Sequence, residues 1–122
     1  MQSELMATLM RIHLDMRALL GGVARTFGLT AQQIEMLCLL KQFDDPTFGR
    51  LAEHLGCDRA NITGLADRLT RRGFVVREAD PADRRVTRLR LTEAGDSFAD
   101  EVRAAVDAAV HARWSTRADA LR

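Results

Sequence analysis

The chain has 122 residues, enough for one domain with a modest core and too few for two ordinary domains. Apolar residues make up 47% and charged residues 29% of the chain, a soluble globular balance; with no membrane-length apolar run and no signal-peptide pattern, we expect a cytoplasmic protein without a membrane partner. The net charge of +1 by itself excludes neither nucleic acid nor protein partners.

Residues 2–26 are predicted to form one long helix. Its apolar side chains recur at spacings of four, three, four, three and four residues, which is a heptad pattern. Gly28 is expected to end the helix. The apolar stripe is wider than a solvated surface helix needs, so it favours contact with a partner chain; a core helix in a monomer is the alternative. The repeating residues are Leu5, Leu9, Ile12, Met16, Leu19 and Val23.

Three shorter helices are predicted next, each after a residue that can accept a hydrogen bond from the first turn. Asp44-Asp45-Pro46 and Gly56 separate them by short turns, and Gly73 ends the last one. Two short helices joined over a turn that contains glycine are typical of the helix-turn-helix arrangement. The helices are predicted over 31–42, 48–55 and 59–72, with Thr30, Thr47 and Asp58 as their N-caps.

The pattern then changes from helical to strand-like. Residues 74–78 form a short β-type run, and residues 86–91 alternate apolar and polar side chains as a strand does. A turn at 80–83 lies between them, which predicts a β-hairpin with a charged tip. A final helix is expected to begin at Thr92, and the residues after Trp114 are expected to begin a separate helix with its own N-cap.

The helix over 59–72 carries small and polar residues opposite its apolar side. Ala60 and Gly64 would let it lie against the floor of a DNA groove, and Asn61 can make a bidentate contact to adenine. A solvated face, the alternative, would more usually carry Glu and Lys. The surrounding residues 50–90 hold ten arginines and six acidic residues, a net charge of +4, in a chain with one lysine. Because Arg matches phosphate and guanine edges, this clustering favours nucleic acid.

The predicted hairpin tip is a second candidate DNA contact. Asp83, Arg84 and Arg85 are adjacent there, and an arginine held away from the core can enter a narrow minor groove. Asp83 is placed to hold one guanidinium. The alternative is a solvated turn in which the acid and the arginines neutralise each other.

No residue pattern indicates an enzyme, a metal site or a cofactor. His54 and Cys57 have a spacing that two metal ligands can use, but no further Cys or His lies near in sequence to complete a zinc site. Cys57 lies beside Arg59 at a predicted helix N-terminus and is a candidate redox-reactive thiol, whereas Cys38 is expected in the core. The sequence lacks paired carboxylates, a Ser-His-Asp arrangement and a phosphate-binding glycine loop, so we expect no catalytic activity.

Together these segments resemble the MarR family of bacterial transcription regulators. The resemblance covers about residues 5–110 and rests on the order and spacing of several motifs, none of which is unique alone. The motifs are Leu29-Thr30-Ala31-Gln32-Gln33, the run from Leu51 to Leu69, Arg72-Gly73-Phe74-Val75, Asp80-Pro81-Ala82-Asp83-Arg84-Arg85 and Leu91-Thr92-Glu93-Ala94-Gly95.

The resemblance implies a mainly α-helical winged helix-turn-helix with a small β-hairpin wing, forming a single domain over 1–122. Residues 30–91 would form the DNA-binding lobe, and 1–27 and 92–122 the dimerisation helices of a homodimer. Such proteins usually repress promoters, bind inverted repeats in double-stranded DNA, and release it on binding a small, often phenolic ligand or on cysteine oxidation. The expected DNA contacts are Thr30, Thr47, Arg59, Ala60, Asn61, Thr63, Gly64, Arg68, Arg71, Asp83, Arg84 and Arg85, with Asp83 orienting Arg85 in the minor groove; the expected dimer contacts are Leu5, Leu9, Ile12, Met16, Val102, Val106 and Val110.

A protein of a different class is the alternative: a winged-helix module that docks another protein through apolar terminal helices. Only 31 residues follow Leu91, fewer than members of the family usually have, and this favours the alternative slightly, as does the near-zero net charge. The wing arginines and the small-residue helix face favour DNA binding.

Overall fold

The computed structural model describes residues 2–120 and, within them, the side chains of residues 3–115. The predicted helices and strands agree with its elements to within one residue at almost every boundary, and the mainly helical class with a two-stranded antiparallel hairpin is confirmed. The elements are α1 (Gln2–Phe27), α2 (Ala31–Gln42), α3 (Phe48–Leu55), α4 (Arg59–Arg71), β1 (Val75–Ala79), β2 (Thr87–Leu91) and α5 (Glu93–Ala120).

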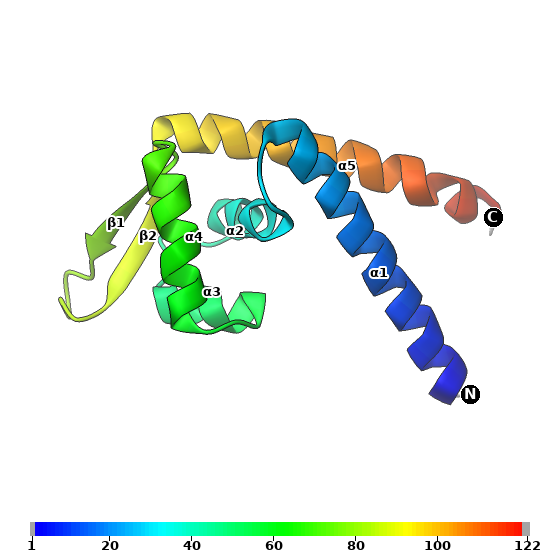
Figure 1. Cartoon of the computed structure of the whole chain (residues 1–122), viewed down its shortest axis with the longest axis horizontal. Coiled ribbons are helices and arrows are strands. Elements are labelled where there is room, and N and C mark those ends of the chain that lie inside the picture. The colour runs from blue at the N-terminus through cyan, green and yellow to red at the C-terminus, as the bar shows by residue number, and fades with distance from the viewer. Residues whose placement is uncertain (1, 121–122) are drawn as a thin grey trace.

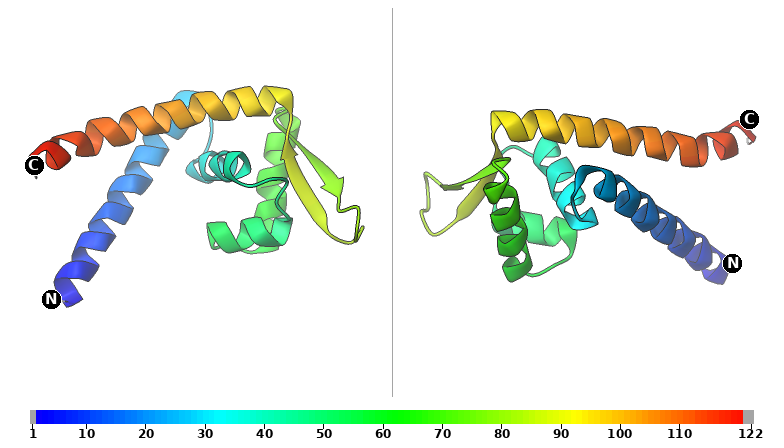
Figure 2. Two further views of the ribbon diagram at one scale, coloured as in Figure 1. Left: turned by 180° about the vertical axis from the view of Figure 1, so that it is seen from behind. Right: turned by 45° about the horizontal axis from the view of Figure 1, so that its top comes forward.

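The long helix α5 runs along one side of the molecule, with α2, α3, α4 and the hairpin gathered beneath its N-terminal half (Figure 1). Helix α1 meets α5 near its own C-terminal end and then diverges from it toward the N-terminus, away from the other elements (Figure 2). We call the part formed by α2, α3, α4, β1 and β2 the head.

The predicted separate helix start after Trp114 is wrong, because α5 continues without a break from Glu93 to Ala120. The residues that follow Trp114 include no glycine or proline, and nothing in their sequence therefore interrupts the backbone hydrogen bonds of the helix.

The predicted N-caps of the short helices are confirmed. Thr30 accepts a hydrogen bond of 3.2 Å from the backbone of Gln33, whose side chain accepts one of 2.8 Å from the Thr30 N–H, so the two residues form a capping box. Asp58 accepts a hydrogen bond of 2.8 Å from the backbone N–H of Asn61 at the start of α4. Gly56, in the turn between α3 and α4, has a φ of 63°, which glycine adopts at little cost.

The hydrophobic core lies inside the head and extends to both long helices. The predicted apolar face of α4 is buried, with Ile62 and Leu69 fully inaccessible, and Val75 and Leu89 bring the base of the hairpin into the same core. The core also takes Leu20, Val23 and Ala24 from α1 and Ala99 and Val102 from α5, so it crosses the expected boundary between DNA-binding lobe and dimerisation helices.

In the described part of the chain, no helix is long and apolar enough to cross a membrane.

Candidate nucleic-acid interface

The outward face of α4 is open and carries little side-chain bulk. Ala60 and Asn61 are exposed, and a Cβ added to Gly64 would meet no other atom within 4 Å. The side chain of Asn61 makes no hydrogen bond to any other described residue, so its amide is free for an external partner. The Thr63 hydroxyl donates a 3.0 Å hydrogen bond to the carbonyl oxygen of Arg59, which leaves its oxygen as an acceptor only.

The ten arginines of residues 50–90 divide into two groups of five. In the first, the guanidinium has a partner in the protein: Arg77 with Asp67, Arg85 with Asp83, Arg88 with Asp80, Arg90 with Glu78, and Arg72 with the carbonyl oxygen of Gly28. In the second, the guanidinium makes neither an ion pair nor a hydrogen bond within the part that the structure describes. These are Arg50, Arg59, Arg68, Arg71 and Arg84, all of them exposed.

The second group contains four predicted DNA contacts and one residue that the sequence reasoning missed. Arg50 lies at the start of α3, where its Cζ sits 4.7 Å from the centroid of the Phe43 ring. Nothing in the sequence distinguished Arg50 from the paired arginines, because pairing depends on acidic side chains that the fold brings together.

The wing tip holds an arginine in a defined, outward position. Arg85 donates from Nε to Asp83 Oδ1 at 3.1 Å and from Nη2 to Oδ2 at 3.2 Å, so the predicted contact between the two residues is present and is bidentate. The Arg85 side chain is nevertheless 90% exposed. The hydrogen bonds from the Arg85 guanidinium and backbone N–H lower the pKa of the Asp83 carboxyl below its ordinary value. The tip thus presents a pre-oriented cation.

The base of the hairpin is fastened to the turn between α2 and α3. β1 and β2 pair antiparallel from Val75 opposite Leu91 to Ala79 opposite Thr87. Thr47 adds an isolated bridge to Arg88, and the Leu89 N–H donates to the carbonyl oxygen of Pro46 at 3.0 Å. No pattern in the sequence marked this bridge, because a single backbone pairing leaves no periodicity in the side chains.

Two predicted DNA contacts, Thr30 and Thr47, are helix N-caps. Each hydroxyl oxygen accepts a backbone hydrogen bond, from Gln33 and from Arg50 respectively. Since a hydroxyl has one hydrogen to donate besides its acceptor sites, a phosphate contact by either residue is compatible with its role as a cap.

The apolar stripe of α1 is exposed where the helix leaves the head. Leu5 is 61%, Leu9 55% and Ile12 47% exposed, whereas Met16 is half-buried and packs against the core. Val106 and Val110 on α5 are half-buried. Val102 was expected to contact a partner chain, but its side chain is completely inaccessible in the core of this chain, which leaves it no surface for such a contact.

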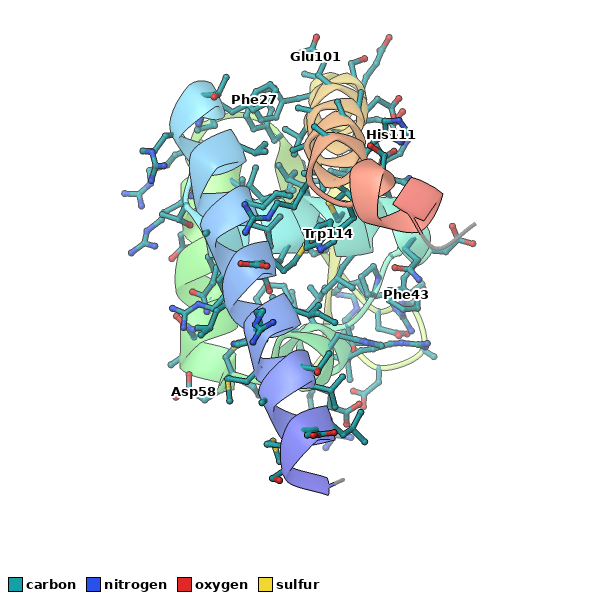
Figure 3. The ribbon with its side chains drawn as sticks, turned by 90° about the vertical axis from the view of Figure 1, so that its right-hand side faces the viewer. Phe27, Phe43, Asp58, Glu101, His111 and Trp114 are labelled. Carbon is teal, nitrogen blue, oxygen red and sulfur yellow. The ribbon has the colours of Figure 1, made fainter. Side chains whose placement is uncertain are left out.

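A cleft of about 650 Å³ lies between α1 and α5. Leu19, Val23 and Phe27 form its α1 wall, and Ala105 and Ala109 are among the small residues of its α5 wall. Figure 3 shows Phe27 at the end of α1 that lies beside α5. Asp15 and Arg113, which also line the cleft, form an ion pair of 2.8 Å between the two helices.

The cysteines and His54 are not brought together into a reactive site. His54 stacks on Phe43, with 4.7 Å between ring centroids, and Cys57 is half-buried against the core. Burial raises the pKa of the Cys38 thiol, which makes it less reactive. Among the described residues, no group of three or more His, Cys, Asp or Glu side chains is placed to hold a metal ion.

The chain is similar in sequence to known transcriptional regulators. The sequence model of the MarR family matches residues 29–87. The transcriptional repressor MprA of Escherichia coli (strain K12) is 41% identical over 61 residues, which are 50% of this chain and 35% of that protein. The transcriptional repressor NicR of Pseudomonas putida is 35% identical over 72 residues, 59% of this chain and 46% of that protein. The matched segments thus span only about a third to a half of these curated relatives.

Solved structures match over most of the length of this chain. A MarR-family transcriptional regulator from Rhodococcus sp. RHA1 is 28% identical with a TM-score of 0.82, covering 93% of this chain and 81% of that one. CouR from Rhodococcus jostii RHA1, solved bound to p-coumaroyl-CoA, is 30% identical with a TM-score of 0.78, covering 94% and 84% of the two chains. MprA and NicR are named as transcriptional repressors, and the protein from Rhodococcus sp. RHA1 as a transcriptional regulator.

Proposed function

The chain belongs to the MarR family, and we propose that it is a DNA-binding transcriptional regulator that acts as a homodimeric repressor. The observation that carries this proposal is the outward face of α4, where small residues, the free amide of Asn61 and the unpaired cations of Arg68 and Arg71 lie together. A face of this kind fits the major groove, where an amide can pair with adenine and guanidinium groups can neutralise phosphates. Arg85 then reaches the neighbouring minor groove from the wing tip.

A homodimer gives the DNA-binding surface two-fold symmetry. The exposed apolar half of α1 supports a partner chain of the same sequence, because an isolated protomer would leave Leu5, Leu9 and Ile12 in water. A two-fold axis places two copies of α4 in successive major grooves, about 34–36 Å apart. The operator is then an inverted repeat.

A small ligand bound in the cleft between α1 and α5 would release the DNA. The cleft has apolar walls and one ion pair, which suits an aromatic molecule that carries an acidic group. Narrowing it with Ala109→Phe is expected to abolish release by aromatic acids and thioesters such as p-coumaroyl-CoA and to leave DNA affinity unchanged. Titrating the ligand into the protein–DNA complex measures release, and titrating the protein into DNA without ligand measures the affinity.

The decisive experiment is selection from a randomised duplex pool at about 0.15 M salt, with the oligomeric state measured in the same buffer. Enrichment of an inverted repeat by a dimer is the expected result. On the selected duplex, Asn61→Ala is expected to relax the base preference at one position, and Arg85→Ala to weaken binding. If a folded protein enriches no sequence, the proposal is contradicted and the protein-docking module becomes the better interpretation.

A further inference from the structure

Arg77 connects the wing, which is the hairpin of β1 and β2, to α4. It lies on β1, and its Nη2 pairs with the carboxylate of Asp67 and donates a 3.3 Å hydrogen bond to the carbonyl oxygen of Thr63, both on α4. The guanidinium also lies over the ring of Phe48, the first residue of α3, with Cζ 5.4 Å from the ring centroid. A single side chain therefore contacts both helices of the helix-turn-helix.

No other side chain of the two strands hydrogen-bonds to α4 among the described residues. The partners of Arg88 and Arg90 lie in the hairpin or in the turn between α2 and α3. Val75 and Leu89 hold the base of the hairpin in the core, but the residues beyond Arg77 on β1 are exposed. The hairpin is thus held to the turn between α2 and α3 through β2, and its direct side-chain hydrogen bonds to α4 come from Arg77 among the described residues.

The pair also removes an electrostatic conflict. Asp67 lies on the outward side of α4, where an unpaired carboxylate would repel phosphate groups. Paired with Arg77, it carries no isolated negative charge toward the DNA.

We propose that Arg77 is a positioning residue that sets the angle between the wing and α4, so that Arg85 enters the minor groove while Asn61 lies in the major groove. The proposal rests on the DNA-binding function proposed above. Two contacts made in adjacent grooves must keep a fixed separation, and a loosely held wing would lose its contact while α4 kept its own.

The test is a set of double-mutant cycles on the selected duplex. In the wild-type background, Arg85→Ala is expected to weaken binding by about tenfold, and in the Arg77→Met background by less than about threefold, because the wing is already displaced. Asn61→Ala is expected to weaken binding by the same factor in both backgrounds. Backbone ¹⁵N relaxation of residues 83–85 without DNA is expected to show greater mobility in Arg77→Met.

Arg90→Met is the matched control, because Arg90 is also an ion-paired arginine of the hairpin but makes no contact with α4. Its effect is expected to combine additively with that of Arg85→Ala. Additive effects of Arg77→Met and Arg85→Ala would overturn the proposal. So would equal coupling of Arg77→Met to Asn61→Ala and to Arg85→Ala, because Arg77 would then stabilise the whole head and not the wing in particular. If Arg77→Met does not fold, Asp67→Asn breaks the same pair from the other side and enters the same cycles.

Failure of the underlying function gives a different result. If the wild-type protein selects no sequence, or if Arg85→Ala has no effect in the wild-type background, the DNA-binding proposal or its wing contact fails, and the role of Arg77 falls with it.

Discussion

Pairing within the protein separates the arginines of the head into two kinds. Residues 50–90 have a net charge of +4, but five of their ten arginines are held by partners in the protein. Arg85 is paired with Asp83 and yet 90% exposed, so its pair orients the guanidinium without burying it. Arg71 and Arg90 show the contrast, since Arg71 is exposed on α4 and has no partner among the described residues, while Arg90 is paired with Glu78 on the opposite strand. Charge counted along the sequence shows that cations gather in this region, but not which of them the fold leaves without an acidic partner.

Arg71→Ala is expected to weaken DNA binding and to lower the slope of log affinity against log salt by about one, because one phosphate contact is lost. Arg90→Ala removes the same charge from the sequence and serves as the control. Because its guanidinium is already paired, its slope is expected to change less. Affinities measured from low to high salt give both slopes, and equal changes would contradict the division into paired and unpaired arginines.

The pKa of Asp83 reports the orientation of Arg85. Hydrogen bonds from Arg85 lower it below the ordinary value of 3.8. A lowered pKa in the folded protein means that the pair contributes stability above the ordinary value and loses this contribution as the pH falls through the lowered pKa. The wing tip therefore keeps its geometry throughout neutral and mildly acidic solution.

Arg85→Met is expected to raise the pKa of Asp83 toward 3.8, since the guanidinium is the largest cause of the lowering. Carboxyl ¹³C titration by NMR measures this value directly. The control is Arg90→Met, which is expected to raise the pKa of Glu78, whose main partner is Arg90, and to leave that of Asp83 in place. The Arg85 backbone N–H still donates to Asp83 in this variant, so only a pKa of Asp83 that does not change at all would contradict the side-chain pairing.

At the scale of elements, close approach between α5 and the start of β1 requires a glycine. A Cβ on Gly95 would lie 1.8 Å from the carbonyl oxygen of Phe74, a backbone atom that cannot turn aside. Gly64 has the opposite environment, because nothing lies within 4 Å of its Cβ position. Gly95 is therefore required by close packing, whereas Gly64 is not.

Gly95→Ala is expected to lower the free energy of unfolding by about 1–3 kcal/mol or more, because α5 must shift from the hairpin base. Gly64→Ala is expected to raise it by about 0.5–1 kcal/mol, the usual difference between the two residues inside a helix. Urea unfolding monitored by circular dichroism compares them. A Gly95→Ala protein as stable as the wild type would contradict the close approach to Phe74, and a Gly64→Ala protein of lower stability would contradict the open environment of Gly64.

The extent to which sequence predicted these elements depended on how local their causes were. Thr30, Thr47 and Asp58 act on their own first turns, so the starts of α2, α3 and α4 were predicted correctly. The bridge from Thr47 to Arg88 joins residues far apart in the chain, and no local pattern marked it. The continuous helix through Ser115 was missed because a residue that can cap a helix can equally lie inside one.

The candidate nucleic-acid interface was likewise predictable where it depends on one helix, and not where it depends on contacts between elements. The small outward residues of α4 followed from helical periodicity, whereas the burial of Val102 depended on which side of α5 the head covers. Arg50 and Arg77 were missed because their environment is formed by residues from separate elements.

At the scale of the whole molecule, the exposed half of α1 determines the oligomeric state that we propose. Leu9→Asp places a charge in the middle of the apolar stripe and is expected to yield monomers by analytical ultracentrifugation and to weaken binding to the inverted repeat strongly. The head is expected to stay folded, because Leu9 lies outside the core. Arg11→Asp, at a neighbouring exposed position, is the control for added negative charge. If the Leu9→Asp protein is still a dimer, the dimer interface does not involve the exposed half of α1.

The two sides of α4 have a consequence for how such a regulator can change over evolutionary time. Ile62 and Leu69 fill the core, whereas Ala60 and Asn61 support nothing inside the protein. Exposed positions of this kind usually change stability by no more than about 0.5 kcal/mol when they are substituted. A duplicated copy can therefore acquire a new operator through a few outward substitutions without first losing its fold, and the same positions are the natural place to retarget the protein by design.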